Sequence, residues 1–253
     1  MREQIKDLCR ELKLPTVLAR FEQCASSALR RGASFEEYLA ELLEEEVAER
    51  MERRRARRIK EARFSLAKSI ESFDFSRSPD LPQSLILELA TGAYLDAKEN
   101  IIFIGDCGTG KTHLATALGL AACEQGRCVR FTTVAQLAGE LIEAKDAREL
   151  TRAIARYGRV ELLILDEMGF VPLSKAGAEL VFQVISERCE KASIIITTNL
   201  PFAEWTAIFT DGRLCKAVVD RVTYRSHIID TGDTSIRFEE SLKRQKGGAK
   251  FNA

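Results

Sequence analysis

The sequence predicts an α/β domain with a mostly parallel sheet flanked by helices, preceded by a small all-helical domain. Short apolar runs that look like strands alternate with helical stretches beyond residue 100. Such alternation is typical of parallel sheets covered by helices. A glycine-rich turn directly follows the first of these runs. Residues 1–65 instead carry a helical pattern of apolar side chains and large blocks of like charge.

Length and composition fit one full domain plus a smaller one. The chain has 253 residues, of which 45% are apolar, which allows a sizeable core. It has no signal-peptide pattern at its start, and its apolar runs are too short to cross a bilayer. Its seven cysteines are scattered and it has two histidines, which argues against a zinc site and favours reduced thiols. We therefore expect a cytoplasmic protein with no membrane partner.

The helical domain, expected over residues 1–65, has clear start and stop signals. Pro15 suits the start of a helix, and Gly32 interrupts the helical pattern. Ser34 and Glu37 have the spacing of a capping box, which predicts the start of a longer helix. The apolar stripe of that helix fades after Met51. We expect this domain to contact DNA or a partner and to take part in oligomer contacts.

The net charge of zero hides a sharp segregation of charge. Seven glutamates and no basic residue occupy residues 36–49, and nine basic residues against two glutamates occupy residues 50–68. Such a basic block suits nucleic-acid phosphates or an acidic partner, although a charge run can also be a solvated helix face. The residues expected to contact DNA are Arg53, Arg54, Arg55, Arg57 and Arg58.

A linker and then the α/β domain follow. Residues 66–82 are rich in serine and proline, and their aromatic side chains Phe73 and Phe75 are expected to dock on the next domain. The α/β domain is expected over residues 83–238, followed by a basic tail over residues 239–253. A helix is expected near residues 83–90. The expected strands cover residues 101–104, 128–133, 162–165 and 194–198, with a weaker one at 227–231.

The glycine-rich turn at residues 105–112 matches G-x-x-x-x-G-K-[ST]. Between a strand and a helix this pattern is a P-loop, whose backbone N–H groups and helix N-terminus hold phosphates. Lys111 is expected at the β- and γ-phosphates of ATP, and the Thr112 hydroxyl at Mg²⁺. The expected nucleotide contacts are Gly105, Asp106, Cys107, Gly108, Thr109, Gly110, Lys111, Thr112 and His113.

Two further strand ends complete the predicted site. The apolar run 162–165 ends in Asp166 and Glu167, at the end of the strand where α/β sheets bind ligands. We expect Asp166 to hold Mg²⁺ and Glu167 to polarise the attacking water, which favours ATP hydrolysis. Asn199 ends the 194–198 run. It could orient the water or read the γ-phosphate, or it could be a turn residue before Pro201.

These residues, with several others, resemble the AAA+ ATPases and, within them, the IstB-like insertion-sequence ATP-binding proteins, relatives of the DnaC helicase loaders. The resemblance covers nearly the whole chain. The segments that carry it are Glu61-Ala62-Arg63-Phe64, Ser72-Phe73-Asp74-Phe75, Gly110-Lys111-Thr112-His113-Leu114-Ala115, Asp166-Glu167-Met168-Gly169-Phe170, Thr197-Thr198-Asn199-Leu200-Pro201-Phe202, Glu204-Trp205, Asp220-Arg221 and Gly232-Asp233-Thr234-Ser235-Ile236-Arg237.

The resemblance implies roles that the residues alone leave open. It implies that Asn199 is a polar sensor and that Arg221 is an arginine finger acting on a neighbouring subunit. Arg213 and Arg225 lie nearby and are rivals for that role. Fewer than forty residues follow Arg221, too few for the full helical lid of many AAA+ proteins. The role of Arg237 stays open.

The function implied is that of an ATP-dependent helper of DNA transposition. Subunits with bound ATP would form a homo-oligomer on duplex target DNA and recruit and stimulate the transposase of the same element, and ATP hydrolysis would reset the assembly. One alternative is a DnaC-like loader of a replicative helicase. Another is an adaptor that binds ATP without hydrolysing it, against which Glu167 argues.

Overall fold

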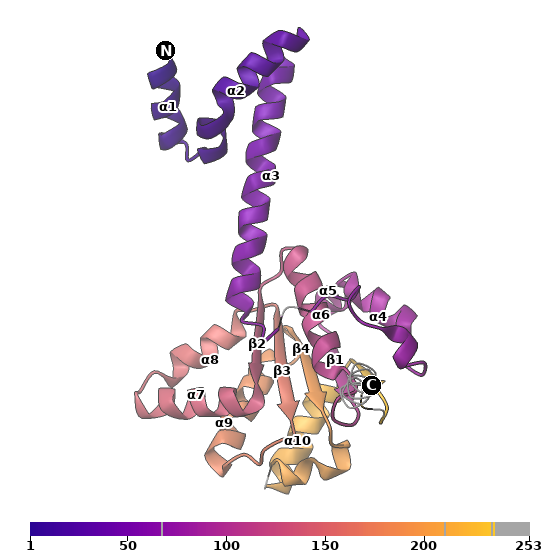
Figure 1. Ribbon diagram of the computed structural model, residues 1–253. Helices are drawn as coiled ribbons and strands as arrows, with labels where there is room; N and C mark the ends of the chain where they lie inside the picture. Colours follow the sequence, from indigo (N-terminus) through magenta and orange to yellow (C-terminus); the bar gives the residue numbers. More distant parts are fainter. Residues whose placement is uncertain (67, 210, 234, 236–253) are drawn as a thin grey trace, which may run out of the picture. The chain divides into compact units, whose positions relative to one another are not determined.

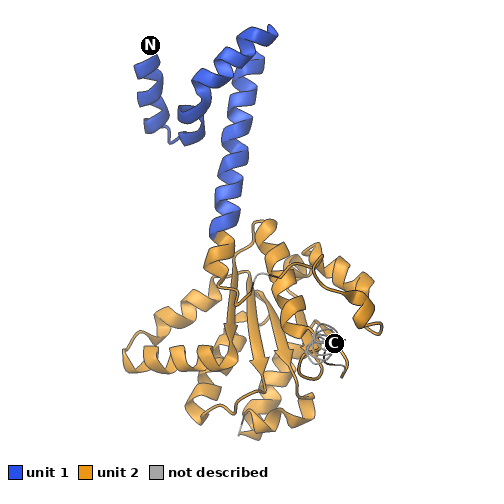
Figure 2. Ribbon diagram, in the orientation of Figure 1, with its two compact units in different colours: residues 1–57 blue, residues 58–253 orange. Residues whose placement is uncertain are grey.

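The computed structural model describes residues 1–66, 68–209, 211–233 and 235. The chain forms two compact units, residues 1–57 and residues 58–253 (Figure 2). The division lies inside a long helix, earlier than the boundary at residue 65 expected from the sequence. The reason is that Ala62 is buried in the core of the second unit, with Ile59 and Phe64 packed against it.

The first unit is helical, as predicted. It contains α1 (Arg2–Glu11), α2 (Pro15–Arg31) and the larger part of α3 (Phe35–Ala62) (Figure 1). The predicted capping box is present: the backbone N–H of Ser34 donates to Glu37 Oε2 (2.7 Å), and that of Glu37 donates to Ser34 Oγ (3.2 Å). The small core of the unit comprises Cys9, Val17, Phe21 and Leu42.

Part of the basic block serves the fold of this first unit. Glu46 is 3% exposed and accepts hydrogen bonds from the backbone N–H groups of Thr16 (2.8 Å) and Val17 (3.2 Å). Arg50 pairs with Glu46 at 3.0 Å, and Arg53 Nη2 donates to Thr16 Oγ1 at 2.8 Å. These contacts tie the start of α2 to α3. Arg53 therefore has a role in packing, and the DNA contact expected of it stays a prediction.

The second unit is built on a five-stranded parallel sheet in the order β2-β3-β4-β1-β5 (Figure 1). All five strands predicted from the sequence are present. They are β1 (Asn100–Ile104), β2 (Val129–Thr133), β3 (Leu162–Met168), β4 (Ser193–Thr198) and β5 (Ser226–Asp230). Because they are parallel, their carboxyl ends meet at one edge of the sheet, and this edge carries the predicted site.

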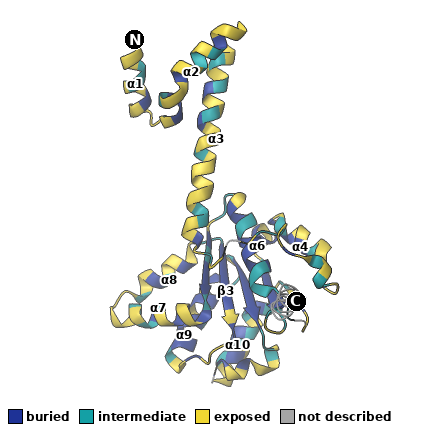
Figure 3. Cartoon of the chain, viewed as in Figure 1, coloured by how far each residue is buried: buried dark blue, intermediate teal, exposed yellow. Residues whose placement is uncertain are grey.

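Helices cover both faces of the sheet, so its strands are buried (Figure 3). Ile101 and Phe103 of β1 belong to the core beneath α6, and Ile102 between them belongs to the opposite core, as the alternation of side chains along a strand requires. On the α6 side lie α4 (Gln83–Ala90), α5 (Ala93–Ala97) and α6 (Lys111–Glu124). The opposite core includes α7 (Val134–Asp146), α8 (Leu150–Gly158), α9 (Lys175–Arg188), the 3₁₀ helix η2 (Phe202–Ala207) and α10 (Gly212–Thr223).

The linker docks on the second unit, as expected from its aromatic residues. Phe73 is buried in the core that contains α6, and Phe75, which begins the 3₁₀ helix η1 (Phe75–Arg77), packs against that core. Their rings lie 4.9 Å apart in an edge-to-face arrangement. Among the described residues, no helix is both long and apolar enough to cross a membrane.

Arg188, at the end of α9, is buried and has no carboxylate partner in the described part of the chain. It is 1% exposed, and it donates to the backbone carbonyls of Tyr157 (2.6 Å), Val160 (2.9 Å), Glu161 (3.3 Å) and Ser193 (2.8 Å). Burial lowers the pKa of Arg188 to about 10. The guanidinium therefore joins the end of α8 to the starts of β3 and β4, and it satisfies carbonyls that would otherwise lack partners.

We expect Arg188→Met to destabilise the second unit strongly, because four carbonyl groups, two of them in buried hydrogen bonds, lose this donor. The expected loss is about 3 kcal/mol, which lowers Tm by roughly 6–12 °C in a protein of this size. Thermal unfolding followed by circular dichroism measures it. The control is Lys191→Met, a nearby side chain that is 72% exposed and should change stability by less than about 0.5 kcal/mol. Equal Tm values for Arg188→Met and wild type would contradict the role given to Arg188.

Candidate nucleotide-binding site

The P-loop leaves β1 and ends at the start of α6, at the carboxyl edge of the sheet (Figure 1). Gly108 and Gly110 have φ values of +89° and +97°, a left-handed conformation that favours glycine. A Cβ atom on Gly108 would lie 2.3 Å from Ser235 Oγ, and one on Gly105 would lie 2.7 Å from the carbonyl oxygen of Gly232. The glycines thus let the loop turn while packed against the segment after β5.

The segment after β5 holds the P-loop in place. Thr231 donates its backbone N–H to the carbonyl of Ile104 (2.7 Å), and its hydroxyl lies 2.7 Å from that of Thr109. The backbone N–H of Asp106 donates to the carbonyl of Gly232 at 3.0 Å. The sequence analysis missed this support. The available signal was the position of Thr231 at the end of the weak fifth strand, next to a glycine.

Lys111 and Thr112 lie where the motif predicts. Lys111 Nζ donates to the carbonyl oxygens of Gly105 (2.7 Å) and Asp106 (2.6 Å), so the ammonium group lies inside the curve of the loop. The Thr112 hydroxyl donates to Asp166 Oδ1 at 3.0 Å. The structure therefore brings together a hydroxyl and a carboxylate, the oxygen donors that Mg²⁺ prefers when phosphates and waters supply its other ligands.

Asp166 and Glu167 differ sharply in their surroundings although they are adjacent in sequence. Asp166 is 4% exposed and accepts a second hydrogen bond, at 2.5 Å, from the Thr197 hydroxyl. Glu167 is exposed and has φ +61°, at an irregularity in the pairing of β3 with β4. The backbone N–H of Glu167 donates to Thr197 Oγ1 at 3.0 Å. One threonine of β4 thus fixes both acidic residues.

Thr197 is a site residue that the sequence analysis did not single out, because it became visible only through strand pairing. Asn199, two residues later, lines the same cleft. If Gly169 were replaced by a larger residue, the new Cβ atom would lie 3.1 Å from Asn199 Oδ1 and would crowd the Asn199 side chain. The chain after Asn199 is fixed by buried Trp205, whose Nε1–H donates to the carbonyl of Leu200 at 3.2 Å.

The linker forms one wall of the cleft, which has a volume of about 560 Å³. His113 Nε2 lies 3.0 Å from both the Ser69 carbonyl oxygen and Ser72 Oγ, and its ring meets that of Phe73 edge-to-face at 5.1 Å. Burial lowers the pKa of His113, which favours a neutral imidazole. The residues of this wall are Ser65, just before the linker, and the linker residues Leu66, Lys68, Ser72, Phe73, Asp74 and Arg77. The sequence analysis expected the linker to dock but not to line the site.

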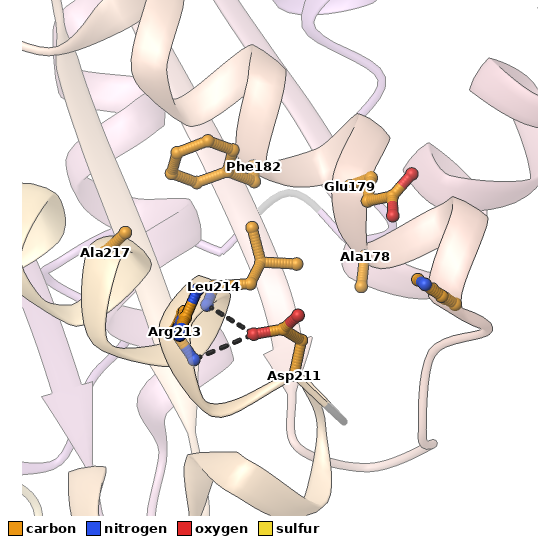
Figure 4. A pocket seen from close by; sticks show the side chains of 8 residues that line it. Ala178, Glu179, Phe182, Asp211, Arg213, Leu214 and Ala217 are labelled. Carbon is orange, nitrogen blue, oxygen red and sulfur yellow. Dashed lines mark hydrogen bonds between the residues drawn. The ribbon is translucent and has the colours of Figure 1, made fainter.

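None of the three candidate arginine fingers lines this cleft in the part of the chain that the structure describes. The Arg221 guanidinium lies 4.9 Å from the Phe182 ring centre, and its Nη1 donates to the carbonyl of Ala217 at 3.1 Å. Arg213 lines a separate pocket of about 330 Å³ between α9 and α10, where Asp211 caps α10 (Figure 4). Arg225 is exposed, immediately before β5. Arg237 and the tail over residues 239–253 lie outside the described residues.

Of the residues expected to contact DNA, Arg54, Arg55 and Arg57 are exposed and Arg58 is half-buried. Arg55 lies 3.7 Å from Glu52. Arg58 belongs to the second unit, while the other four belong to the first. The block predicted as one surface from the sequence is therefore divided between two compact units.

The family match covers most of the chain. Residues 7–244 match the model of the family described as IstB-like ATP binding protein. The chain belongs to this family. It is 36% identical to the ATP-binding protein of insertion sequence IS5376 from Geobacillus stearothermophilus, over 97% of this chain and 98% of that protein. It is 34% identical to the ATP-binding protein of insertion sequence IS21 from Pseudomonas aeruginosa, over 95% of this chain and 91% of that protein.

Two solved structures of similar fold are the DnaC helicase loader and DnaA. The crystal structure of the DnaC helicase loader has a TM-score of 0.55 and 23% identity, and the match covers 66% of this chain and 98% of that one. DnaA from Aquifex aeolicus, bound to AMPPCP, has a TM-score of 0.58 and 20% identity, and the match covers 76% of this chain and 57% of that one. The α/β unit of this IstB-like protein therefore has the AAA+ fold.

Proposed function

We propose that this IstB-like protein is an ATPase that assists DNA transposition. Subunits with bound ATP assemble on duplex target DNA and recruit and stimulate the transposase of the same element, and hydrolysis resets the assembly. The observation that carries the ATPase proposal lies in the cleft beside the P-loop: Asp166 accepts hydrogen bonds from the hydroxyls of Thr112 and Thr197, and Thr197 also accepts one from the backbone N–H of Glu167. The insertion-sequence relatives, matched over almost their full length, support the role in transposition.

Each group of the cleft has a task in this proposal. The loop N–H groups and Lys111 bind the phosphates of ATP, and Thr112 and Asp166 hold Mg²⁺. Bound Mg²⁺ neutralises charge on the β- and γ-phosphate oxygens. Glu167, exposed beside the buried Asp166, accepts a proton from the attacking water. Asn199 orients that water or contacts the γ-phosphate.

The position of Glu167 argues against an adaptor that binds ATP without hydrolysing it. The residue is exposed, lines the cleft beside the buried Asp166, and is held there by the contact of its backbone N–H with Thr197. Simple binding of ATP gains nothing from a second carboxylate in the cleft, whereas hydrolysis needs a group that accepts a proton from water. The helicase-loader alternative has support from the DnaC fold, but 23% identity supports the fold alone.

The test of the transposition role is strand transfer by the transposase encoded beside this protein in its element. With ATP and a target plasmid, the wild-type protein should stimulate strand transfer, while a replicative helicase should not be loaded onto single-stranded DNA. Stimulated helicase loading without any stimulation of strand transfer would replace this proposal with the loader alternative.

DNA binding through the exposed arginines of the first unit is tested separately. Arg54→Ala/Arg55→Ala should weaken duplex binding similarly for unrelated sequences, because phosphate contacts carry no base preference. The slope of log K against log salt should flatten by about 2. Fluorescence anisotropy over a salt series with saturating ATP measures it. Arg10→Ala/Arg30→Ala removes the same charge from exposed positions on α1 and α2 and should change the slope by less than about 0.5. An unchanged slope in the first variant would assign these arginines to a protein partner.

A further inference from the structure

A second pocket, of about 360 Å³, lies on the α/β unit away from the P-loop. It is formed where the last turns of α3, the edge strand β2 and the end of α8 meet. Four of its nine lining residues are arginines, which come from three separate segments of the chain, and one is an acid. The lining residues are Arg58, Glu61, Cys128, Val129, Arg130, Arg156, Tyr157, Arg159 and Val160. The sequence analysis noted only Arg58 among these arginines.

The positive charge of this pocket is mostly unbalanced. Arg156 is paired with Glu140 of α7. Arg58, Arg130 and Arg159, by contrast, form no ion pair with a carboxylate anywhere in the described part of the chain. Arg63 likewise forms no ion pair with a carboxylate among the described residues, and it lies close enough to Arg130 to lower the pKa of that residue. The fold therefore gathers like charges that repel one another, and its described residues supply too few acids to offset them.

Arg130 is the central residue of this cluster. It lies on β2, at the edge of the sheet, and is half-buried. Its Nε atom is buried and has no hydrogen-bond partner. Burial is the main cause that lowers the pKa of Arg130; the neighbouring Arg63 and Arg156 lower it further, while a hydrogen bond between the Arg130 and Tyr157 side chains opposes the shift. A buried donor without a partner is costly, so the cluster is better suited to a bound anion than to folding alone.

We infer that this pocket binds backbone phosphates of duplex DNA, as a second DNA contact located on the ATPase unit itself. Guanidinium groups match phosphate oxygens in pairs of parallel hydrogen bonds. The inference rests on the proposed function, because it assumes that the protein binds DNA. It adds a site that is rigidly attached to the sheet carrying the nucleotide cleft.

The lining favours a phosphate backbone over an acidic protein segment. Protein docking sites centre on exposed aromatic or aliphatic anchors. Here Val129 and Tyr157 are buried (4% and 1% exposed), and none of the described large apolar side chains that are exposed lines the pocket. At its surface the pocket presents the charged side chains Glu61, Arg156 and Arg159 rather than large apolar ones.

The first test removes Arg159, which lines the pocket, and Arg63, which lies beside it close to Arg130; neither forms an ion pair with a carboxylate among the described residues. Arg63 and Arg159 are both exposed, so Arg63→Gln/Arg159→Gln should fold normally. Its duplex binding with saturating ATP should show a salt slope lower by about 2. The matched control is Arg148→Gln/Arg152→Gln, which removes the same charge from exposed positions on and just before α8, outside the pocket. Its slope should change by less than about 0.5. Equal slopes for the two double variants would overturn the inference, because they would show a general effect of net charge.

The second test uses Cys128, which is exposed and lines the pocket. Duplex DNA added with ATP should slow the alkylation of Cys128 by iodoacetamide several-fold, while ATP alone should leave it unchanged. Cys107 of the P-loop is also exposed and should be protected by ATP without DNA, which provides an internal control. Mass spectrometry of the tryptic peptides measures both rates. Unprotected Cys128 at a DNA concentration that saturates binding would overturn the inference.

The outcomes separate this inference from the proposed function. If wild-type protein fails to bind duplex DNA, the proposed function fails. If wild-type protein binds DNA while Arg63→Gln/Arg159→Gln binds it with the same salt slope, only the second DNA contact is refuted. If that variant binds DNA normally but no longer stimulates the transposase, the pocket is a docking site for protein, which also refutes the inference.

Discussion

Glu167→Gln is expected to bind ATP as the wild type does and to hydrolyse it at least about 100-fold more slowly. The amide has nearly the shape of the carboxylate but cannot accept a proton from water. The contact between the Glu167 backbone N–H and Thr197 Oγ1, 3.0 Å long, does not involve the side chain and should survive. Phosphate release under saturating ATP measures turnover, and a fluorescent ATP analogue measures binding.

The matched control for this variant is Glu190→Gln. Glu190 is also exposed and has a left-handed backbone, with φ +62° against +61° for Glu167, but it does not line the cleft. Its substitution should leave turnover unchanged within about two-fold, since it removes the same charge away from the reacting groups. Equal turnover in Glu167→Gln and wild type would remove Glu167 from the mechanism.

Arg221→Ala is expected to bind ATP normally and to lose about a thousand-fold in turnover, the usual effect of removing an arginine finger. In its own chain Arg221 packs on Phe182 and does not line the nucleotide cleft. We therefore expect it to act on a neighbouring subunit. Phosphate release by Arg221→Ala, Arg213→Ala and Arg225→Ala, each checked for folding by thermal unfolding, identifies which arginine carries the effect.

A mixing experiment tests the action between subunits directly. Lys111→Ala lacks the cation of the P-loop but keeps Arg221, whereas Arg221→Ala keeps an intact P-loop. In a mixed oligomer, half of the interfaces between the two variants join an intact P-loop on one subunit to an intact Arg221 on its neighbour. ATPase activity should therefore return. Absence of any recovery, in mixtures that native mass spectrometry shows to contain both chains, would contradict a role in trans.

The strands and the motif residues could be predicted from the sequence because each is encoded over a few consecutive residues. The run 162–165 predicted β3, which in the structure continues to Met168 through the irregularity that carries Glu167. The P-loop pattern likewise placed Lys111 at the start of α6. The division between the compact units was less predictable, since α3 runs without interruption across it.

The sequence by itself determined the parallel α/β class, the strands and the groups suited to ATP chemistry, because apolar periodicity and the P-loop are local patterns, and its resemblance to the AAA+ ATPases named the family of that fold. The tertiary structure decided which residues surround those groups. Thr197 reaches Asp166 and Glu167 because β4 pairs with β3. Strand order differs from chain order, and pairing joins residues about thirty positions apart, such as Asp166 and Thr197. The same long-range packing brings Arg58, Arg130 and Arg159 to one pocket. No short stretch of sequence records such pairings, because they depend on how whole elements pack around a common core.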